Sequence, residues 1–330
     1  MRITVLGSGS WGTAVANILA HKGHKVCLLG RDPEAMADIT ARHENKRYLP
    51  GIALAPTLTA TADAEKAFAQ AEVCLLAVPA QSLAENLCQY ADMVPRSIIP
   101  ICLSKGIEIA TNRRMSQVVA ECWPFAAERY AIFSGPSFAQ ETACGLPTAV
   151  VLASANQSLC ERLREELSYD RLRIYSSQDV LGVEIGGACK NIIAIAAGVC
   201  DGLELGTNAR AALITRGLAE ITRLGVKLGA HPTTFMGLSG MGDLVLTCTG
   251  ALSRNRSVGL ELGKGKKLAD ILSAMHNVAE GVPTTKAVYK LAQSVGVETP
   301  IAKSMYKVLY EESSPAQEVD ALLARTLKDE

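Results

Sequence analysis

The chain has 330 residues, a length typical of about two domains. Its 33 basic and 33 acidic residues balance, so net charge gives no reason to expect a nucleic acid or a membrane surface as partner, although a local basic pocket could still bind a small anion. The ten cysteines form no CxxC pair, and Cys74, Cys102 and Cys200 lie in apolar runs. This pattern indicates buried thiols in a reducing compartment rather than a disulfide framework.

The N-terminal residues lead directly into a strand-like run, Arg2–Leu6, without the pattern of a signal peptide. The longest wholly apolar stretch lies near Ile192–Cys200, and it is much shorter than the roughly 20 residues needed to cross a bilayer. We therefore expect a soluble, cytoplasmic protein that neither inserts into a membrane nor binds nucleic acid.

In the first half of the chain, short apolar runs alternate with helical patterns. Several runs are continuously apolar, as expected for strands buried on both faces of a parallel sheet. The predicted strands are Ile3–Leu6, Val26–Leu29, Val73–Val78, Ile98–Leu103, Ala131–Phe133, Ala149–Leu152 and Leu172–Tyr175. The helices predicted between them include Ser10–Lys22, Ser82–Tyr90, Asn112–Cys122 and Gln157–Leu167. This alternation predicts an α/β fold with a Rossmann-type, doubly wound sheet.

After about Ser177, helical patterns replace the strand-like runs. The predicted helices are Val180–Cys200, Asn208–Leu228, Lys267–Ala274, Thr284–Ser294 and Pro300–Tyr310, with loop-like interruptions at Gly237–Gly242 and Gly263–Lys267. We therefore predict a dinucleotide-binding domain at residues 1–178 and an all-helical substrate-binding and catalytic domain at residues 179–330.

A glycine loop of the form GxGxxG follows the first predicted strand and opens the first predicted helix. In this context Gly7 allows a tight turn, Gly9 lets the backbone approach a pyrophosphate, and Gly12 lets the helix pack on the strand. The helix N-terminus then offers its N–H groups to the phosphates. We predict a bound dinucleotide here; the alternative is a glycine-rich turn without a ligand.

The second predicted strand ends at Leu29-Gly30-Arg31-Asp32, and Arg31 lies 24 residues after Gly7. NAD sites place an acidic residue near this position for the ribose hydroxyl, whereas an arginine suits the 2′-phosphate of NADP. We predict a preference for NADP(H), with NAD(H) as an alternative because Asp32 is adjacent. The competing interpretation of Arg31 is a solvated loop residue.

Lys190 lies inside a predicted helix, and Gly186 and Gly187 precede it by one turn on the same face. A glycine inside a helix costs about 1 kcal/mol relative to alanine, so two of them together require a reason. Lys190 would lie over a surface where a ligand or another backbone can approach closely. The alternative is a lysine at the edge of a helix-packing face.

Four further polar segments lie at predicted turns or helix starts. Lys105 and the turn Ser134–Ser137 follow predicted strands, at the sheet edge where ligands of this fold bind. Asp243 follows a Gly-Met-Gly turn and could simply cap a helix. The cluster Ser253–Arg256 could be an exposed loop, or it could form a cradle for an oxyanion, because guanidinium groups suit phosphate.

Six motifs together closely resemble the bacterial NAD(P)-dependent glycerol-3-phosphate dehydrogenases, from the first strand to about Tyr310. The motifs are GSGSWGT at Gly7–Thr13, SKG at Ser104–Gly106, SGPSFAQE at Ser134–Glu141, GGACKN at Gly186–Asn191, GMGDLVLTC at Gly240–Cys248 and SRNR at Ser253–Arg256. The resemblance implies reversible hydride transfer between NAD(P)H and dihydroxyacetone phosphate, which supplies sn-glycerol 3-phosphate for phospholipid synthesis.

The resemblance also implies roles for individual residues. It makes Lys190 the catalytic acid/base. The implied substrate-binding residues are Lys105, Gly135, Ser137, Lys190, Asp243, Ser253, Arg254 and Asn255. The implied cofactor-binding residues are Gly7, Gly9, Ser10, Trp11, Gly12, Arg31, Lys105, Ala139, Arg254, Val278 and Glu280.

The residues themselves fit these implied roles. Reduction of a ketone requires a proton donor beside the carbonyl oxygen, and Lys190 is such a donor. Burial would lower the pKa of this lysine, whereas a carboxylate such as Asp243 and a substrate phosphate would raise it. We expect only partial desolvation, so that the charged form prevails with substrate bound. We predict no metal site, because the five histidines, including His276, show no metal-site spacing with acidic or cysteine partners.

Two rival functions fit parts of the same pattern. A dehydrogenase acting on a β-hydroxy acid would also combine a Rossmann domain, a helical domain and a lysine, but SRNR and Lys105 favour a phosphorylated substrate. A non-catalytic dinucleotide sensor would have no use for a lysine above two glycines. A homodimer would suit a two-domain dehydrogenase.

Overall fold

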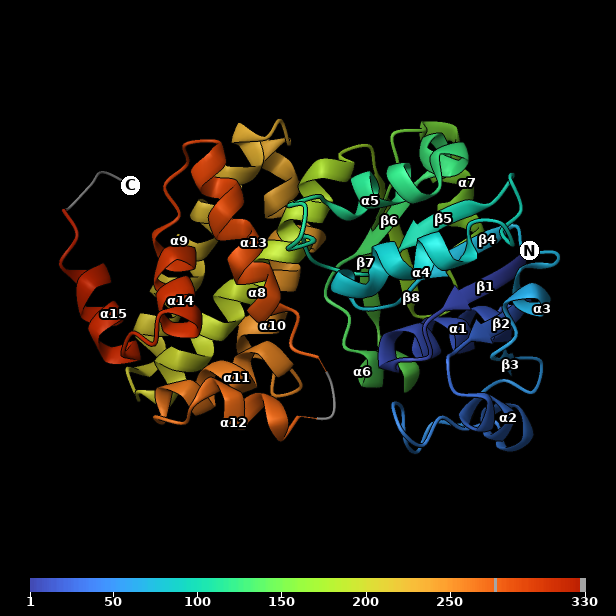
Figure 1. Cartoon of the computed structure of the whole chain (residues 1–330), viewed down its shortest axis with the longest axis horizontal. Coiled ribbons are helices and arrows are strands. Elements are labelled where there is room, and N and C mark those ends of the chain that lie inside the picture. The colour runs from blue at the N-terminus through green and yellow to red at the C-terminus, as the bar shows by residue number, and fades with distance from the viewer. Residues whose placement is uncertain (276–277, 327–330) are drawn as a thin grey trace. The chain divides into compact units, whose positions relative to one another are not determined.

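The computed structural model describes residues 1–275 and 278–326. It divides into two compact units, each described here by itself (Figure 1). The N-terminal unit comprises residues 1–105 and 113–180. The C-terminal unit comprises residues 106–112 together with the chain from Leu181 onward. The chain therefore leaves the N-terminal unit for seven residues and returns to it before entering the C-terminal unit again.

The N-terminal unit contains one sheet of eight strands in the order β3-β2-β1-β4-β5-β6-β7-β8. The strands are β1 (Arg2–Leu6), β2 (Lys25–Leu29), β3 (Thr59–Thr61), β4 (Val73–Leu76), β5 (Ile99–Cys102), β6 (Ala131–Ser134), β7 (Thr148–Ala153) and β8 (Leu172–Ser177). All pairs are parallel except β6 with β7, which is antiparallel. The predicted doubly wound sheet is confirmed, and β3 is an additional edge strand.

Helices connect these strands (Figure 1). They are α1 (Ser10–His21), α2 (Pro33–Arg42), α3 (Ala64–Phe68), α4 (Leu83–Tyr90), α5 (Met115–Cys122), α6 (Ala139–Ala143) and α7 (Gln157–Leu167), with 3₁₀ turns η1 (Ala80–Ser82) and η2 (Pro124–Arg129). The sequence contains a signal for the start of α2, because Asp32 caps the helix and Pro33 is its first residue.

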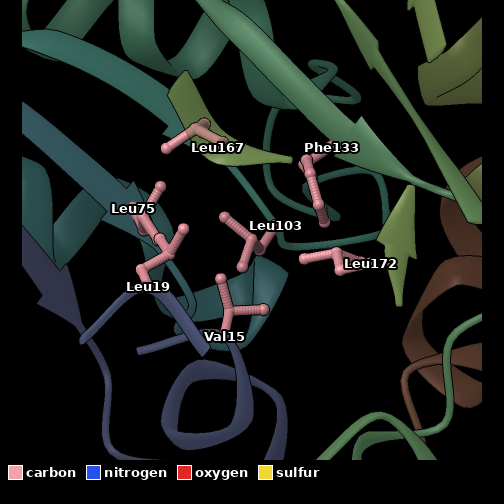
Figure 2. Close-up of a pocket in the computed structure, with 7 residues that line it drawn as sticks. All are labelled: Val15, Leu19, Leu75, Leu103, Phe133, Leu167 and Leu172. Atoms are coloured by element: carbon pink, nitrogen blue, oxygen red, sulfur yellow. The ribbon is translucent and has the colours of Figure 1, made fainter. Parts of the chain in front are cut away.

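The core of the N-terminal unit lies between the sheet and its helices. Figure 2 shows seven apolar side chains around a gap of about 10 Å³ in this core: Val15, Leu19, Leu75, Leu103, Phe133, Leu167 and Leu172. The gap offers no polar group that could hold a water or a ligand. It is therefore an imperfection of packing and not a binding site.

Helices are the main elements of the C-terminal unit from Leu181 onward, as predicted, whereas residues 106–112 are not helical. Its helices are α8 (Val180–Gly202), α9 (Gly206–Lys227), α10 (Asp243–Thr249), α11 (Arg254–Gly263), α12 (Leu268–Ser273), α13 (Gly281–Ser294), α14 (Pro300–Tyr310) and α15 (Pro315–Leu323). A 3₁₀ turn η3 (Pro232–Met236) and a π-helical turn η4 (Leu238–Gly242) precede α10.

Helix α8 runs through the middle of this unit and is buried along most of its length (Figure 1). It is long and apolar enough to cross a membrane, with a mean hydropathy of 1.5, but 89% of that window is buried inside the protein. The wholly apolar run Ile192–Cys200 is therefore only the C-terminal part of a longer, largely apolar helix. Burial of this extent is typical of the core helix of a globular domain.

Glycines let the backbones of α8 and α11 touch. A Cβ atom on Gly198 would lie 2.0 Å from the carbonyl oxygen of Arg256, and one on Gly259 would lie 1.9 Å from that of Ile195. Neither position can hold a larger residue without moving a helix. Close packing therefore explains why α8 tolerates glycines that weaken an isolated helix.

Glu220 of α9 is a buried carboxyl group at the N-terminus of α14. It is 3% exposed and accepts hydrogen bonds of 2.9 Å from the backbone N–H groups of Ile301 and Ala302. Burial raises the pKa of Glu220 to about 7, although these backbone bonds and the charges of Arg223 and Arg325 act in the opposite direction. The folded protein therefore holds this proton more tightly than the unfolded chain does.

This shift predicts a stability that falls as pH rises from 4.5 to 7. Across that window the folded state binds more protons than the unfolded state, so the free energy of unfolding decreases by up to about 3 kcal/mol. Urea unfolding at pH 5 and pH 8 measures the change. Glu220→Gln should remove most of this pH dependence, whereas Glu311→Gln, at an exposed position, should keep it. If the free energy of unfolding changed equally with pH in both variants, Glu220 would not be the responsible group.

Candidate active site

The glycine loop between β1 and α1 has two packed glycines and one open glycine. Gly7 has φ +113°, and a Cβ atom there would lie 2.7 Å from the carbonyl oxygen of Ala77. A Cβ on Gly12 would lie 2.3 Å from the carbonyl oxygen of Gly7. A Cβ on Gly9 would meet no protein atom within 4 Å. Packing within the protein therefore accounts for Gly7 and Gly12, whereas Gly9 borders open space.

The N-terminus of α1 is suited to an anion. Its N-cap, Gly9, makes no side-chain hydrogen bond, and its first turn holds no acidic residue, so the helix dipole is not neutralised there. Strand β1 pairs with both β2 and β4, and α1 therefore begins where the strand order reverses. Ligands of doubly wound sheets bind at this point.

The side chains of Ser10 and Trp11 are engaged within the N-terminal unit. The Ser10 hydroxyl donates to the carbonyl oxygen of Tyr48 at 2.6 Å. The rings of Trp11 and Phe133 have centroids 6.3 Å apart. These contacts fix the first turn of α1, so both residues hold the loop in shape.

Arg31 and Asp32 at the end of β2 differ in their surroundings. Arg31 is exposed and makes no hydrogen bond or ion pair within the described residues. The Asp32 carboxylate accepts from the backbone N–H groups of Glu34 at 3.1 Å and Ala35 at 3.2 Å. Asp32 therefore serves as the cap of α2, and Arg31 is the residue whose charge is available for a ligand.

Three residues predicted from two separate motifs meet at the carboxyl ends of β5 and β6. The Lys105 ammonium donates to the carbonyl oxygen of Gly135 at 3.2 Å, and the Ser137 hydroxyl donates to the same oxygen at 2.9 Å. A Cβ on Gly135 would lie 2.8 Å from the Cα atom of Val150. Ala139 begins the short helix α6 just beyond this turn.

In the C-terminal unit, Lys190 forms a buried ion pair. Its ammonium donates to Asp243 Oδ1 at 2.6 Å and to the Thr247 hydroxyl at 2.7 Å. The side chains of Lys190 and Asp243 are 9% and 1% exposed. The Thr247 hydroxyl donates in turn to the backbone carbonyl oxygen of Asp243 at 2.6 Å. The ammonium is thus held in one direction by two oxygens.

The glycine before Lys190 brings this pair together. A Cβ on Gly186 would lie 2.8 Å from the carbonyl oxygen of Ser239 in the π-helical turn η4. Because Gly186 has no side chain, η4 approaches α8 and delivers Asp243, the next residue after the turn. For Gly186 the close-packing interpretation applies: a backbone packs against it, and this packing places a carboxylate on the lysine.

Asp243 is not the N-cap of α10. It has helical backbone angles and is the first residue of the helix, which follows η4 without a break. Thr247 lies one turn later on the same face and was not identified from the sequence. The Asp-to-Thr spacing of four residues in DLVLT was the available signal.

Cys248 lies next to this pair but is not a nucleophile. Burial raises the pKa of its thiol to about 12, although the positive charge of Lys190 acts in the opposite direction. Since the thiolate is the reactive form, Cys248 is a packing residue. The lysine is the titratable group of this cluster that is suited to proton transfer.

The SRNR segment begins a helix and is not an exposed loop. Ser253 is the N-cap of α11 and accepts from the backbone N–H of Arg256 at 3.3 Å. Arg256 pairs with Asp201 at 2.6 Å and is therefore structural. Arg254 makes no hydrogen bond within the described part of the chain.

Arg254 is exposed as a residue, although neighbouring protein atoms partly desolvate its guanidinium. This desolvation lowers the pKa of Arg254, and the negative charge of Glu280 acts in the opposite direction. The group stays cationic, because an arginine is effectively always protonated in proteins. A partly desolvated guanidinium without a hydrogen-bonded partner is suited to bidentate binding of an oxyanion such as a phosphate.

Asn255 is a buried link between three helices. Its amide donates to the side-chain oxygen of Asn191 in α8 at 2.9 Å, and its oxygen accepts from the backbone N–H of Gly281 in α13 at 2.9 Å. Asn191 was not identified from the sequence, although it follows Lys190 directly. Val278 is 49% exposed and Glu280 is half-buried, both just before α13.

Among residues 1–275 and 278–326, no three His, Cys, Asp or Glu side chains lie together so that they could hold a metal ion. His276 lies outside the described residues.

Family models match both units of the chain. The model described as the N-terminus of NAD-dependent glycerol-3-phosphate dehydrogenase matches residues 2–160, and the C-terminal model matches residues 179–320. A glycerol-3-phosphate dehydrogenase [NAD(P)+] of Nitratidesulfovibrio vulgaris is 52% identical, with all of both chains covered. The enzyme of the same description from Citrifermentans bemidjiense is 48% identical, covering 100% of this chain and 98% of that one.

Solved structures agree with these relatives. The glycerol-3-phosphate dehydrogenase of Coxiella burnetii has a TM-score of 0.93 and 40% identity, with 98% of this chain and 99% of that chain covered. A D-mandelate dehydrogenase has a TM-score of 0.62 at 15% identity, covering 98% and 100% of the two chains, which is a likeness of fold alone.

Proposed function

Because the chain belongs to the NAD-dependent glycerol-3-phosphate dehydrogenase family, we propose that it transfers a hydride reversibly between NAD(P)H and dihydroxyacetone phosphate. The product, sn-glycerol 3-phosphate, is the backbone precursor of phospholipids. The observation that carries this proposal is the buried Lys190 ammonium, held by Asp243 and Thr247. Neither a dinucleotide sensor nor a purely structural helix core needs such a group.

Lys190 serves as the general acid of ketone reduction. When bound, NAD(P)H would supply the hydride for the carbonyl carbon, and the Lys190 ammonium donates a proton to the carbonyl oxygen. In the reverse direction the neutral amine accepts the hydroxyl proton. The Asp243 carboxylate favours the charged form of its partner, because a nearby opposite charge stabilises the ammonium. Thr247 is a positioning residue that fixes the direction of the ammonium.

Arg254 binds the phosphate of the substrate. Its guanidinium is partly desolvated and makes no hydrogen bond within the described residues, and its planar fork matches phosphate oxygens. The remaining substrate-binding residues of the C-terminal unit are Asp243, Ser253 and Asn255. Those of the N-terminal unit are Lys105, Gly135 and Ser137.

The dinucleotide binds at the glycine loop. Gly9, where the structure leaves open space, and the N-terminus of α1 would hold its pyrophosphate. Arg31 pairs with the 2′-phosphate of NADP, while Asp32 remains the cap of α2. The other cofactor-binding residues are Gly7, Ser10, Trp11, Gly12, Lys105, Ala139, Arg254, Val278 and Glu280.

The proposal also covers location and assembly. The substrate is a small soluble metabolite, and the apolar helix α8 is buried within its own unit, so the enzyme works in the cytoplasm. A homodimer stays a prediction from the two-domain architecture, and sedimentation equilibrium of the purified chain measures it.

Oxidation of reduced nicotinamide in the presence of dihydroxyacetone phosphate tests the function and the cofactor preference together. We expect turnover with both cofactors, faster with NADPH. Arg31→Met should remove most of the preference, because the 2′-phosphate loses its ionic partner, whereas Arg42→Met should not. Turnover with a β-keto acid but not with dihydroxyacetone phosphate would favour the β-hydroxy acid alternative. No turnover with either substrate would favour the dinucleotide sensor. An unchanged preference for NADPH in Arg31→Met would exclude Arg31 as the residue that binds the 2′-phosphate.

Gly9→Ala should impair dinucleotide binding, whereas Gly12→Ala should impair the stability of the fold. Since a methyl group at position 9 meets no protein atom, Gly9→Ala should leave Tm unchanged but weaken dinucleotide binding at least roughly tenfold. Gly12→Ala places a methyl group 2.3 Å from a backbone oxygen and should cost about 1–3 kcal/mol of stability. Calorimetric Tm and fluorescence titration with NADPH measure both; normal binding by Gly9→Ala would remove that glycine from the site.

Lys190→Met and Arg254→Met should separate chemistry from binding. Lys190→Met should lower kcat by about 10²–10⁴-fold with little change in NADPH affinity. Arg254→Met should mainly raise the KM for dihydroxyacetone phosphate. It should also reduce the enzyme's preference for this substrate over non-phosphorylated analogues. Because Lys190→Met leaves a buried carboxylate unpaired, the double variant Lys190→Met/Asp243→Asn serves as the folded control. Substantial kcat in that control would refute the role of Lys190.

A further inference from the structure

Two cysteines on neighbouring helices of the N-terminal unit lie almost within bonding distance. The sulfur atoms of Cys88 in α4 and Cys122 at the end of α5 are 3.1 Å apart, about 1 Å more than the length of a disulfide bond. Cys88 is exposed and Cys122 is partly exposed. Six other cysteines of the chain, in contrast, are buried: Cys74, Cys102, Cys160, Cys189, Cys200 and Cys248.

The residues beside the two thiols hold this geometry. The indole N–H of Trp123, next to Cys122, donates to the carbonyl oxygen of Leu87, next to Cys88, at 2.8 Å. Trp123 is fully buried, and its ring packs edge-on against Phe68 with centroids 6.4 Å apart. The backbones that carry the two cysteines are therefore already fixed against each other, without a covalent bond.

We propose that Cys88 and Cys122 are a redox modification site, in which peroxides oxidise the two thiols to a reversible disulfide between these cysteines. The exposed Cys88 thiolate attacks the peroxide oxygen, which gives a sulfenic acid and releases one water. The Cys122 thiolate then attacks the Cys88 sulfur, forms the S–S bond and releases a second water. Two thiols and one hydrogen peroxide thus give one disulfide and two water molecules. A dithiol reductant reverses the reaction by exchange.

The disulfide would close a covalent ring across 34 positions of the chain. That ring contains β5, Lys105 and the residues 106–112 that belong to the C-terminal unit. Cross-linking restricts the unfolded chain more than the folded one, so the oxidised protein should have the higher Tm. This inference is independent of the proposed enzymatic function, because it depends only on the thiol geometry.

The test uses the full-length reduced protein, hydrogen peroxide, alkylation of the remaining thiols and peptide mass mapping. We expect a disulfide-linked peptide pair containing Cys88 and Cys122, loss of two alkylatable thiols, recovery with dithiothreitol and a Tm raised by a few degrees. Cys88→Ser and Cys122→Ser should each abolish the link and the rise in Tm. Cys144→Ser, which removes another exposed thiol, should retain both.

The same treatment in urea shows whether the fold selects the pair. We expect the preference for Cys88 with Cys122 to disappear when the chain is unfolded. Oxidation of folded protein that modifies Cys88 and Cys144 to equal extents, without a linked peptide, would overturn the proposal. A link that forms only in urea would overturn it as well.

Discussion

The C-terminal unit is arranged around one electrostatic constraint, a lysine ammonium inside an apolar helix core. An isolated charge at such a position is strongly unfavourable, so it requires a partner with good geometry and further hydrogen bonds. Asp243 and Thr247 supply both. They can do so only because η4 lies directly on α8, and η4 lies there only because position 186 has no side chain. The geometry of this ion pair thus depends on a contact between two backbones.

Glycines perform two different tasks in this chain, and their surroundings separate them. Gly12, Gly186, Gly198 and Gly259 are required because protein backbone already occupies the space of a side chain. Gly9 leaves that space empty. Gly9 also has a φ of −68° that other residues adopt, so neither packing nor backbone conformation requires a glycine there. It is therefore the stronger indicator of binding, although it looks the same as Gly12 in the sequence.

Much of the fold was predictable because its elements have strong periodic patterns. All seven predicted strands form, and α7 and α14 match their predicted bounds. The missed elements, such as β3 and α6, are short and take their stability from neighbours in space. The direction of β7 could not be predicted, because a buried strand is equally apolar in parallel and antiparallel pairing. For the site, individual residues were recognisable, but the pairing of Lys190 with Asp243 and Thr247 joins positions more than 50 residues apart.

The path of the chain through residues 106–112 limits how the protein can be divided. Ile107 is 1% exposed and belongs to the apolar core of the C-terminal unit, although strands of the N-terminal unit lie before and after it in the sequence. A fragment ending near residue 180 would carry this isoleucine without its core, and a fragment beginning at 181 would lack it. Neither unit is therefore a contiguous module that gene fusion or truncation could transfer intact. A C-terminal half produced alone would lack part of its own core.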